Sequence, residues 1–522
     1  MNMADLDREA LGAAADRGSL PAYWAARQPD KVAIRSAAGD RTFAEVHANA
    51  NRLVRALWAR GVQAGDGVAL MCSNRPEFAE SVVAVREAGL RLTTINWHLT
   101  ADEAGYIVDN CDATAFVADA QFADAAAGAA KLAPRVKARF AVGGAIDGFE
   151  RWDAALAGQD GAALDETQAG GIMLYTSGTT GRPKGVFKGR GDPRADLDVG
   201  LLTQYDPDRH INLLTGPLYH AAPLAFSWSA PAALGVPIVM MDGWSAEETL
   251  RLIERYRITH THMVPTMFHR LLSLPDEVKS AYDLSSLIFI LHGAAPCPVE
   301  VKQRLMDWLG PIVWEYYAAT EGSGTLVSPH TWLRRPGTVG KVDPPDHIRI
   351  LDAGGADAER GEIGTVYLKA PDANRFEYYK ASEKTAGAYS DSGDYFTLGD
   401  YGYVDTDGYL FLTDRSAHLI ISGGVNIYPA EIEAVLIGHP AVGDVGVVGV
   451  PDDDWGEIVV AVVEPQPGVS PSAGLADELV EWCRERIAHY KCPRSIEFTE
   501  GLPRHDNGKL YKHQLREQLR NQ

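Results

Sequence analysis

A ten-residue segment from Thr176 to Gly185, TSGTTGRPKG, combines residue types that bind phosphate. It contains four hydroxyl side chains, three glycines and one lysine, and it directly follows the apolar run GGIMLY. Glycines let backbone N–H groups approach phosphate oxygens, hydroxyls donate to the same oxygens, and Lys184 adds positive charge. The segment lacks the GK[ST] ending of a Walker loop. It indicates a phosphate loop of another kind, although its composition alone also fits a surface turn.

Several later segments carry single side chains suited to nucleotide chemistry. YYAATEGSG contains Thr320 and Glu321, LGDYG contains Asp400, and LPRHDNGKLYK contains Lys509. The two oxygens of a carboxylate can accept together from the vicinal hydroxyls of a ribose. Each residue also has an ordinary alternative: Asp400 could cap a turn, Glu321 could be a solvated helix residue, Lys509 could lie on an exposed turn and His220 could be a core histidine.

The order of these segments resembles the adenylate-forming superfamily, which includes acyl-CoA synthetases, luciferases and nonribosomal adenylation domains. After the phosphate loop come PLYHAAP, HGAAPCP, YYAATEGSG, LGDYGYVDTDGYLFLTDR, ISGGVNIYPAEIE and LPRHDNGKLYK, so the resemblance covers nearly the whole chain. It implies an enzyme that uses ATP and Mg²⁺ to activate a carboxylic acid as acyl-AMP, with release of pyrophosphate. CoA then takes the acyl group, and AMP is released.

The resemblance assigns roles to individual residues. Tyr317 would stack on adenine, Thr320 and Glu321 would serve the phosphates and magnesium, and Asp400 would bind the ribose; Ala318 stands where the family usually has glycine. The implied catalytic residues are Lys509, Glu321, Thr320 and His220, and the implied metal ligands are Glu321 and Thr180. The implied contacts to ATP and CoA are Thr176, Ser177, Gly178, Thr179, Thr180, Gly181, Lys184, Gly293, Ala294, Ala295, Tyr317, Asp400, Arg415, Gly423, Gly424 and Lys491.

The second half-reaction implies a rotation of the C-terminal domain near Asp414 to Ser416, close to Arg415. The segment Gly423–Asn426 would then replace Lys509 at the site. Lys491 matches a position near the nucleotide end of CoA, and a solvated lysine at a helix end is almost equally compatible. The family commonly has Arg-x-[Lys or Asp]-Asp at the hinge, but Ala417 stands here, so altered domain alternation is the other interpretation.

Apolar residues after His220 and around Met263 are expected to form the acyl pocket. No acidic partner for an α-ammonium group stands out, which favours aliphatic, aromatic or polycyclic acids over amino acids. The segment INWHLTADEAGYIVDNC is similar to bacterial fatty-acid and steroid-side-chain CoA ligases. An acceptor other than CoA, such as a carrier protein, an amine or another nitrogen nucleophile, is the alternative, and the acid stays open. The predicted pocket residues are Phe226, Trp228, Val264 and Met267.

The patterns that position these residues predict an α/β protein with two domains. Helical and apolar segments alternate through the first part, including Thr42–Arg60, Gly67–Met71 and Ser245–Tyr256, and short alternating strands after Gly340 indicate a small β-barrel-like lobe. Near the C-terminus, apolar residues at helical spacing predict an amphipathic helix through Leu475, Leu479, Trp482, Cys483 and Ile487. We expect an N-terminal domain of layered α/β subdomains over residues 1–414 and a mobile α+β lid domain over residues 415–522.

Composition excludes some classes of protein and of partner. A formal net charge of −21 argues against binding to nucleic acid or to an anionic membrane. Five scattered cysteines and no signal-like start indicate a reducing cytoplasmic compartment, and no apolar run is long enough for a transmembrane helix. The expected partners are a small carboxylic acid, ATP and CoA, and a homodimer is compatible with the sequence.

Overall fold

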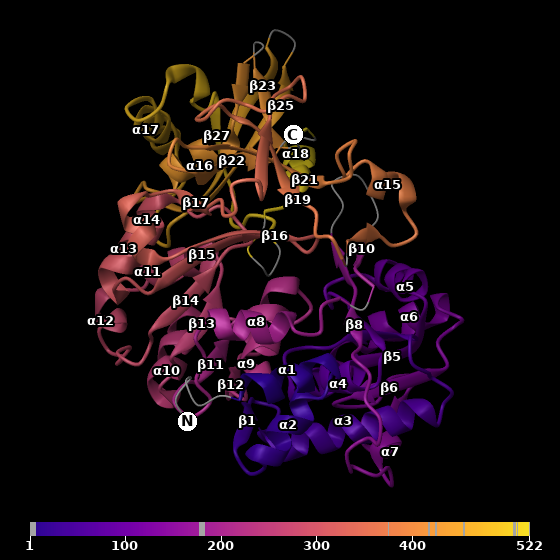
Figure 1. Ribbon diagram of the computed structural model, residues 1–522. Helices are drawn as coiled ribbons and strands as arrows, with labels where there is room; N and C mark the ends of the chain where they lie inside the picture. Colours follow the sequence, from indigo (N-terminus) through magenta and orange to yellow (C-terminus); the bar gives the residue numbers. More distant parts are fainter. Residues whose placement is uncertain are drawn as a thin grey trace. The chain divides into compact units, whose positions relative to one another are not determined.

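The computed structural model describes residues 7–176, 183–189, 191–373, 375–415, 418–422, 425–452, 455–504, 508 and 510–520, apart from the side chains of residues 323, 414, 415 and 426. The chain divides into two compact units, each built from separate stretches of sequence. Unit 1 comprises Met1–His262, Pro275–Ile290 and Pro371–Gly387; unit 2 comprises Met263–Leu274, Leu291–Ala370 and Ala388–Gln522. Figure 1 shows the elements of each unit.

Unit 1 contains a six-stranded parallel sheet in the order β7-β6-β5-β3-β4-β8. Figure 1 labels β5, β6 and β8 of this sheet. Strand β3 shows why the strands of such a sheet are apolar on both faces. Val68 and Leu70 join the core shared with α3 and α4, whereas Ala69 and Met71 join the core shared with α5 and α6. Both faces are therefore covered by helices. The strands are β3 Gly67–Met71, β4 Arg91–Thr94, β5 Ala113–Asp119, β6 Ala138–Val142, β7 Glu150–Arg151 and β8 Gly171–Ile172.

A second run of strands in unit 1 has the order β13-β11-β12-β1-β2. The first four strands are parallel, and β2 closes a hairpin with β1. A third, small antiparallel sheet joins β9, β10 and β20. The bounds are β1 Val32–Arg35, β2 Arg41–Thr42, β9 Leu174–Thr176, β10 Lys184–Phe187, β11 Asn212–Leu214, β12 Ile238–Met240, β13 His260–Met263 and β20 Glu377–Tyr378.

Some helices of unit 1 begin where the sequence supplies a side-chain cap. Thr42 and Glu45 form a capping box at the start of α3, and the Ser245 hydroxyl accepts from the backbone N–H of Glu248 at the start of α10. The helices are α1 Arg8–Asp16, α2 Leu20–Arg27, α3 Phe43–Trp58, α4 Pro76–Glu87, α5 Ala101–Asn110, α6 Ala123–Leu132, α7 Trp152–Leu156, α8 Ala195–Leu202, the π-helix Pro223–Ser229, α9 Ala230–Ala233, α10 Ala246–Tyr256, α12 Asp276–Lys279 and α15 Ser382–Ala386.

Unit 2 contains a five-stranded antiparallel sheet in the order β17-β22-β21-β19-β18, at the place where short alternating strands are predicted. A separate hairpin is formed by β15 and β16. These strands are β15 Val313–Ala318, β16 Ser323–Val327, β17 Thr338–Lys341, β18 Ile348–Leu351, β19 Gly364–Lys369, β21 Tyr395–Val404 and β22 Tyr409–Arg415. The residues of β14, Phe289–His292, are divided between the two units. The accompanying helices are α11 Pro265–Leu272, α13 Val299–Leu309 and α14 Pro329–Arg334.

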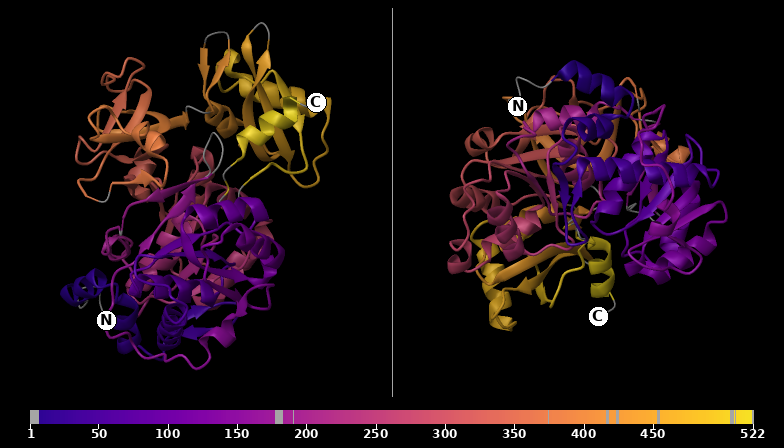
Figure 2. Two further views of the ribbon diagram at one scale, coloured as in Figure 1. Left: turned by 90° about the vertical axis from the view of Figure 1, so that its right-hand side faces the viewer. Right: turned by 90° about the horizontal axis from the view of Figure 1, so that it is seen from below.

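The C-terminal part of unit 2 is a mixed sheet in the order β24-β23-β26-β25, with β27 parallel to β26. The last helix, yellow in Figure 2, packs on β25, where Leu510 and Leu515 join Val448 and Val462. The elements are β23 Ile420–Ser422, β24 Val425–Ile427, α16 Pro429–Leu436, β25 Val442–Asp452, β26 Gly456–Pro465, α17 Ala473–Arg484, β27 Ser495–Phe498 and α18 Lys512–Arg520.

One predicted helix is shorter in the structure. The apolar positions from Leu475 onward suggest a helix reaching Ile487, but α17 ends at Arg484. Ile487 still packs against the same core because a final turn, in which its N–H donates to the Cys483 carbonyl, keeps it on the apolar face. The α/β class is confirmed, all five cysteines are unpaired, and no helix in the described part of the chain is long and apolar enough to cross a membrane.

Candidate active site

The two ends of the predicted phosphate loop face each other across a hairpin. Thr176 on β9 pairs with Lys184 on β10, and the Lys184 ammonium lies 4.6 Å from the ring centre of Tyr378 on β20. The small sheet therefore fixes the entry and exit of the loop in unit 1. The remaining predicted loop residues lie outside the described residues. They are Ser177, Gly178, Thr179, Gly181 and the predicted metal ligand Thr180.

Thr320 and Glu321 lie in the turn of the β15–β16 hairpin in unit 2. The turn is closed by the Ala319 N–H, which donates to the Gly322 carbonyl at 2.8 Å. Glu321 is buried and Thr320 is half-buried. A two-residue turn holds both side chains close to the end of β15, so the spacing of the segment brings a hydroxyl and a carboxylate to one place.

Glycine is required in this hairpin because aromatic rings pack directly on its backbone. A Cβ atom on Gly322 would lie 2.5 Å from Cζ of Phe396, and one on Gly324 would lie 2.7 Å from Cδ1 of Tyr317. Neither distance leaves room for a methyl group. Gly324 thus allows the Tyr317 ring, which precedes the turn, to lie against β16, and Gly322 makes room for Phe396.

Tyr317 and Asp400 are joined by a buried hydrogen bond. The Tyr317 hydroxyl donates to Oδ2 of Asp400 at 2.7 Å, and both side chains are buried. Asp400 lies on β21 directly opposite Arg415 on β22; the side chain of Arg415 is outside the described set. A buried carboxylate needs such donors because it has left water. The structure brings together two residues that are far apart in sequence and that the resemblance assigns to one nucleoside.

The segment 293–295 follows β14 in an unusual conformation. Ala294 has φ +67°, in the left-handed region that L-residues other than glycine rarely occupy, and a Cβ atom on Gly293 would lie 2.6 Å from Cζ of Tyr316. The backbone at Gly293 therefore lies directly against Tyr316 of β15.

A buried ionic cluster adjoins this segment. Lys302 donates to Glu315 at 2.7 Å, and His292 lies 3.4 Å from the same carboxylate. Burial alone would raise the pKa of Glu315, but His292 and Lys302 outweigh that effect and hold the pKa below its usual value. Sequence reasoning missed Lys302 and Glu315. The available signal was a lysine among the apolar positions Val301, Leu305 and Met306 of α13.

The predicted acyl-pocket residues have different surroundings. In unit 1, the Phe226 ring stacks on His262 at 5.6 Å between centroids, and His220 lies next to Tyr219 at 4.4 Å. In unit 2, Val264 precedes α11 and Met267 lies within it; both are buried. Whether these residues share one pocket stays a prediction.

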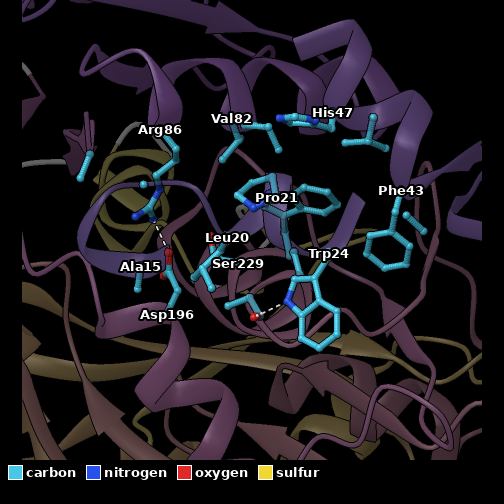
Figure 3. A pocket seen from close by; sticks show the side chains of 18 of the residues that line it. Ala15, Leu20, Pro21, Trp24, Phe43, His47, Val82, Arg86, Asp196 and Ser229 are labelled. Carbon is cyan, nitrogen blue, oxygen red and sulfur yellow. Dashed lines mark hydrogen bonds and ion pairs between the residues drawn. The ribbon is translucent and has the colours of Figure 1, made fainter. Parts of the chain in front are cut away.

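Trp228 lines a separate apolar cavity of about 90 Å³ in unit 1 (Figure 3). The cavity lies among α1 to α4 and the segment 228–233, with the Arg86–Asp196 ion pair at one side. Trp24 also lines it and donates from its indole N–H to the Ala233 carbonyl at 2.8 Å. Phe226 is not among the residues that line this cavity.

The predicted C-terminal residues are described only in part. Lys491 forms an ion pair with Glu431, at 2.7 and 2.8 Å to the two carboxylate oxygens. Gly423 and Gly424 lie outside the described residues, between paired strands in which Ser422 faces Val425. Lys509 and Ala417 are also outside them, so the structure does not place the predicted adenylation lysine or the substituted hinge residue.

The described residues fit a magnesium ion that is held mainly by phosphate. Within the described ranges, no group of three or more His, Cys, Asp or Glu side chains could hold a metal ion. Mg²⁺ typically takes one or two protein carboxylates and completes its octahedron with phosphate oxygens and water. The single buried carboxylate of Glu321 matches that donor set, and a metal site made of protein ligands alone does not.

Comparison with known proteins gives matches over most of the chain. The AMP-binding enzyme family model matches residues 22–379, and the model of the AMP-binding enzyme C-terminal domain matches residues 431–509. A feruloyl-CoA synthase from Amycolatopsis sp. is 33% identical over 503 residues, covering 96% of this chain and 98% of that protein. The long-chain-fatty-acid–CoA ligase FadD13 of Mycobacterium tuberculosis is 33% identical over 489 residues, covering 91% and 93%.

A solved structure shares the fold over the same extent. The crystal structure of the anthranilate CoA ligase AuaEII, in complex with anthranoyl-AMP, superposes with a TM-score of 0.86 at 25% identity, covering 96% of this chain and 97% of the other. The order of motifs in the sequence therefore agrees with whole-chain similarity in both sequence and structure.

Proposed function

The chain belongs to the AMP-binding enzyme family and is an AMP-forming acyl-CoA ligase, and from that premise we propose how its own residues divide the two half-reactions. It activates a carboxylic acid with ATP and Mg²⁺, releasing pyrophosphate, and then transfers the acyl group to CoA with release of AMP. The observation that carries the proposal is the hairpin that places Tyr317, Thr320 and Glu321 within five residues, with Tyr317 bonded to Asp400.

The first half-reaction brings two anions together. The acid's carboxylate attacks the α-phosphorus of ATP, and the bond from that phosphorus to the bridging oxygen of pyrophosphate breaks. Because both reactants are negative, the residues act by positioning and by neutralising charge. The loop from Thr176 to Lys184 holds the leaving phosphates, and Lys509 contacts the acyl and phosphate oxygens.

The nucleoside is held by groups on β15 and β21. Tyr317 offers its ring face to adenine while its hydroxyl stays on Asp400, and the carboxylate of Asp400 accepts from the ribose hydroxyls. The left-handed Ala294 turns the backbone of residues 293–295 along the edge of the base. Glu321 and Thr180, together with phosphate oxygens, would hold Mg²⁺, which would neutralise charge on the phosphates.

The second half-reaction uses the C-terminal residues. We place the boundary of the lid domain at Asp414/Arg415, which falls between the two stretches matched by the family models. Rotation there replaces the Lys509 loop with the segment Gly423–Asn426 and opens a path for the CoA thiol. Lys491 is proposed to contact CoA, and its ion pair with Glu431 makes it a structural partner of α16 in the absence of CoA.

The acid is proposed to have an apolar body. The half-buried Phe226 and the buried Val264 and Met267 favour such acids, and the relatives' names refer to feruloyl, long-chain fatty acyl and anthranilate substrates. A panel of phenylpropenoic, aryl, straight-chain and steroidal acids, assayed for CoA-dependent AMP release, identifies the class. Activity confined to amino acids or short polar acids would overturn this part of the proposal.

Five unpaired cysteines support a cytoplasmic location. The proposed homodimer is tested by light scattering.

Lys509→Ala tests the assignment of the adenylation residue. Loss of one preorganised cationic donor lowers the rate of such a step on the order of 10²-fold or more. We expect acid-dependent ATP–pyrophosphate exchange to fall by that factor, while thioester formation from supplied acyl-AMP and CoA stays near the parental rate. Lys384→Ala, which removes an exposed lysine of α15, is the matched control. Acyl-AMP formation at the parental rate in Lys509→Ala would show that the assignment is wrong.

A further inference from the structure

Arg504 forms a three-point clamp in unit 2. Its Nε and Nη2 donate to the two carboxylate oxygens of Asp444 at 2.6 Å each, and Nη1 donates to the Gly508 carbonyl at 2.7 Å. A weaker bond runs from Nη2 to the Val445 carbonyl at 3.3 Å. One guanidinium therefore connects the loop after β27 to the first part of β25.

The clamp has a rigid side. Asp444 and Val445 belong to β25, an eleven-residue strand paired along most of its length with β26. Both Arg504 and Asp444 are about four-fifths buried, with side-chain exposures of 20% and 19%. A bidentate arginine–carboxylate pair in such surroundings has a fixed orientation, because the planar fork matches both oxygens at once.

The other side of the clamp is a peptide bond. The Gly508 carbonyl belongs to the peptide unit that joins Gly508 to the next residue in the chain, Lys509. Because a peptide unit is planar, a hydrogen bond to its oxygen restrains the whole unit at Gly508, the residue that precedes Lys509 in the sequence. The loop is also tied at its base, where Arg504 bridges Leu510 and the Tyr511 N–H donates to the Pro503 carbonyl at 2.8 Å.

We propose that Arg504, anchored by Asp444, is a positioning residue that sets the placement of Lys509 for adenylation through the Gly508 carbonyl. This inference rests on the proposed role of Lys509. Arg504 itself contacts neither substrate nor reacting atoms in this scheme. Its effect is confined to the half-reaction that uses Lys509, and the transfer of the acyl group to CoA does not depend on it.

Arg504→Lys tests the proposal in the full-length enzyme. Lysine keeps the charge but cannot bond two carboxylate oxygens and a carbonyl in one plane. We expect the adenylation rate, measured by single-turnover formation of acyl-AMP, to fall about 10- to 100-fold, since a displacement of the order of 1 Å has effects of that size. Thioester formation from supplied acyl-AMP and CoA should stay within about twofold of the parental rate, which also shows that the variant is folded.

A matched control is available on a distant strand of the same unit. Arg349 forms an equally good bidentate pair with Asp357, at 2.7 and 2.8 Å, on the exposed edge strand β18. Arg349→Lys should leave both half-reactions unchanged. If Arg504→Lys leaves adenylation at the parental rate, or lowers both half-reactions equally, the positioning role is overturned.

A double variant separates this inference from the role of Lys509. If Arg504 acts through Lys509, Arg504→Lys lowers adenylation no further in a Lys509→Ala background. Additive losses would contradict the inference while leaving the proposed function intact. If Lys509→Ala alone has no effect, it is the proposed function that fails. Asp444→Asn, which weakens the anchor without touching Arg504, should reproduce the selective loss of adenylation.

Discussion

At the scale of single residues, the Tyr317–Asp400 hydrogen bond is the contact that the sequence could not reveal. The two residues are 83 positions apart, and each has an ordinary alternative when considered alone. The sequence did indicate nucleoside binding by each residue, because an aromatic ring and a carboxylate suit a nucleoside. Their partnership depends on β15 and β21 meeting in space, which no local pattern encodes.

Tyr317→Phe isolates the role of that hydrogen bond. Phenylalanine keeps the ring but removes the donor, so a buried carboxylate loses a partner at a cost of about 1–3 kcal/mol. We expect the KM for ATP to rise by about 5- to 100-fold, because Asp400 is no longer held for the ribose; 1.4 kcal/mol corresponds to a factor of ten. The measurement is the steady-state KM for ATP at saturating acid and CoA.

The control removes a comparable hydrogen bond elsewhere. The Tyr205 hydroxyl is buried and donates to Oδ1 of Asn212 at 2.8 Å in unit 1. Tyr205→Phe should lower the melting temperature but leave the KM for ATP unchanged. An unchanged KM in Tyr317→Phe as well would show that the Tyr317–Asp400 bond is only structural.

At the scale of elements, the sequence predicts where helices begin better than where they end. The capping box of Thr42 and Glu45 marks the start of α3, and the predicted range Thr42–Arg60 differs from Phe43–Trp58 by one residue at the start and two at the end. The predicted extension of α17 to Ile487 was wrong because the apolar pattern continues through a turn after the helix ends. The spacing of apolar residues shows which face of a helix is buried, but it does not show where helical hydrogen bonding ends.

The β15–β16 hairpin provides the prediction that belongs to this scale. A Cβ atom at position 324 would lie 2.7 Å from Cδ1 of Tyr317 and 2.8 Å from its carbonyl oxygen. Gly324→Ala must therefore push β15 and β16 apart, at a cost of about 1–3 kcal/mol in the free energy of unfolding. We expect ATP affinity to fall together with stability, because the displaced strand carries Tyr317. Calorimetric titration with ATP and thermal unfolding measure the two effects.

Another glycine shows what the same substitution does without a clash. Gly474 lies in α17, and the nearest atom to a Cβ atom there is 4.0 Å away. Gly474→Ala should stabilise the protein by up to about 1 kcal/mol, because alanine is the better helix former. If Gly324→Ala behaved like Gly474→Ala, the packing of the Tyr317 ring against the hairpin would not be what requires glycine.

At the scale of the whole molecule, motif order was enough to identify the family, but it did not reveal how the compact units are assembled. Residues 371–387 belong to unit 1 although they follow unit 2 segments in sequence. Tyr379 and Lys380 explain this, because both donate to Asp112, at 2.7 and 2.8 Å. Such a return of the chain depends on a side-chain contact between distant segments, so composition and periodicity could not predict it.

The stability of the whole fold should depend on pH through Glu80, a buried carboxyl group on α4. Burial raises the pKa of Glu80, and the hydrogen bonds from Asn49 and Arg41 lower it by a smaller amount. The net result is a rise from 4.5 to about 7. A carboxyl group whose pKa is raised in the folded state binds more protons there than in the unfolded chain. The free energy of unfolding therefore decreases as pH rises from about 4.5 to about 7, by at most about 3 kcal/mol.

Glu80→Gln removes this titration while keeping an oxygen that can accept from Asn49 and Arg41. We expect the variant to be at least as stable as the parent at pH 8 and to lose the decline between pH 4.5 and 7, as measured by urea unfolding across that range. Glu248→Gln, on the exposed pair with Arg251, should leave the decline in place because Arg251 lowers the pKa of that carboxyl group, which gives a pH dependence of the opposite sign. If the free energy of unfolding of Glu80→Gln declines with pH as steeply as that of the parent, other groups cause the decline. Glu80 would then already be ionised in the folded protein near pH 5.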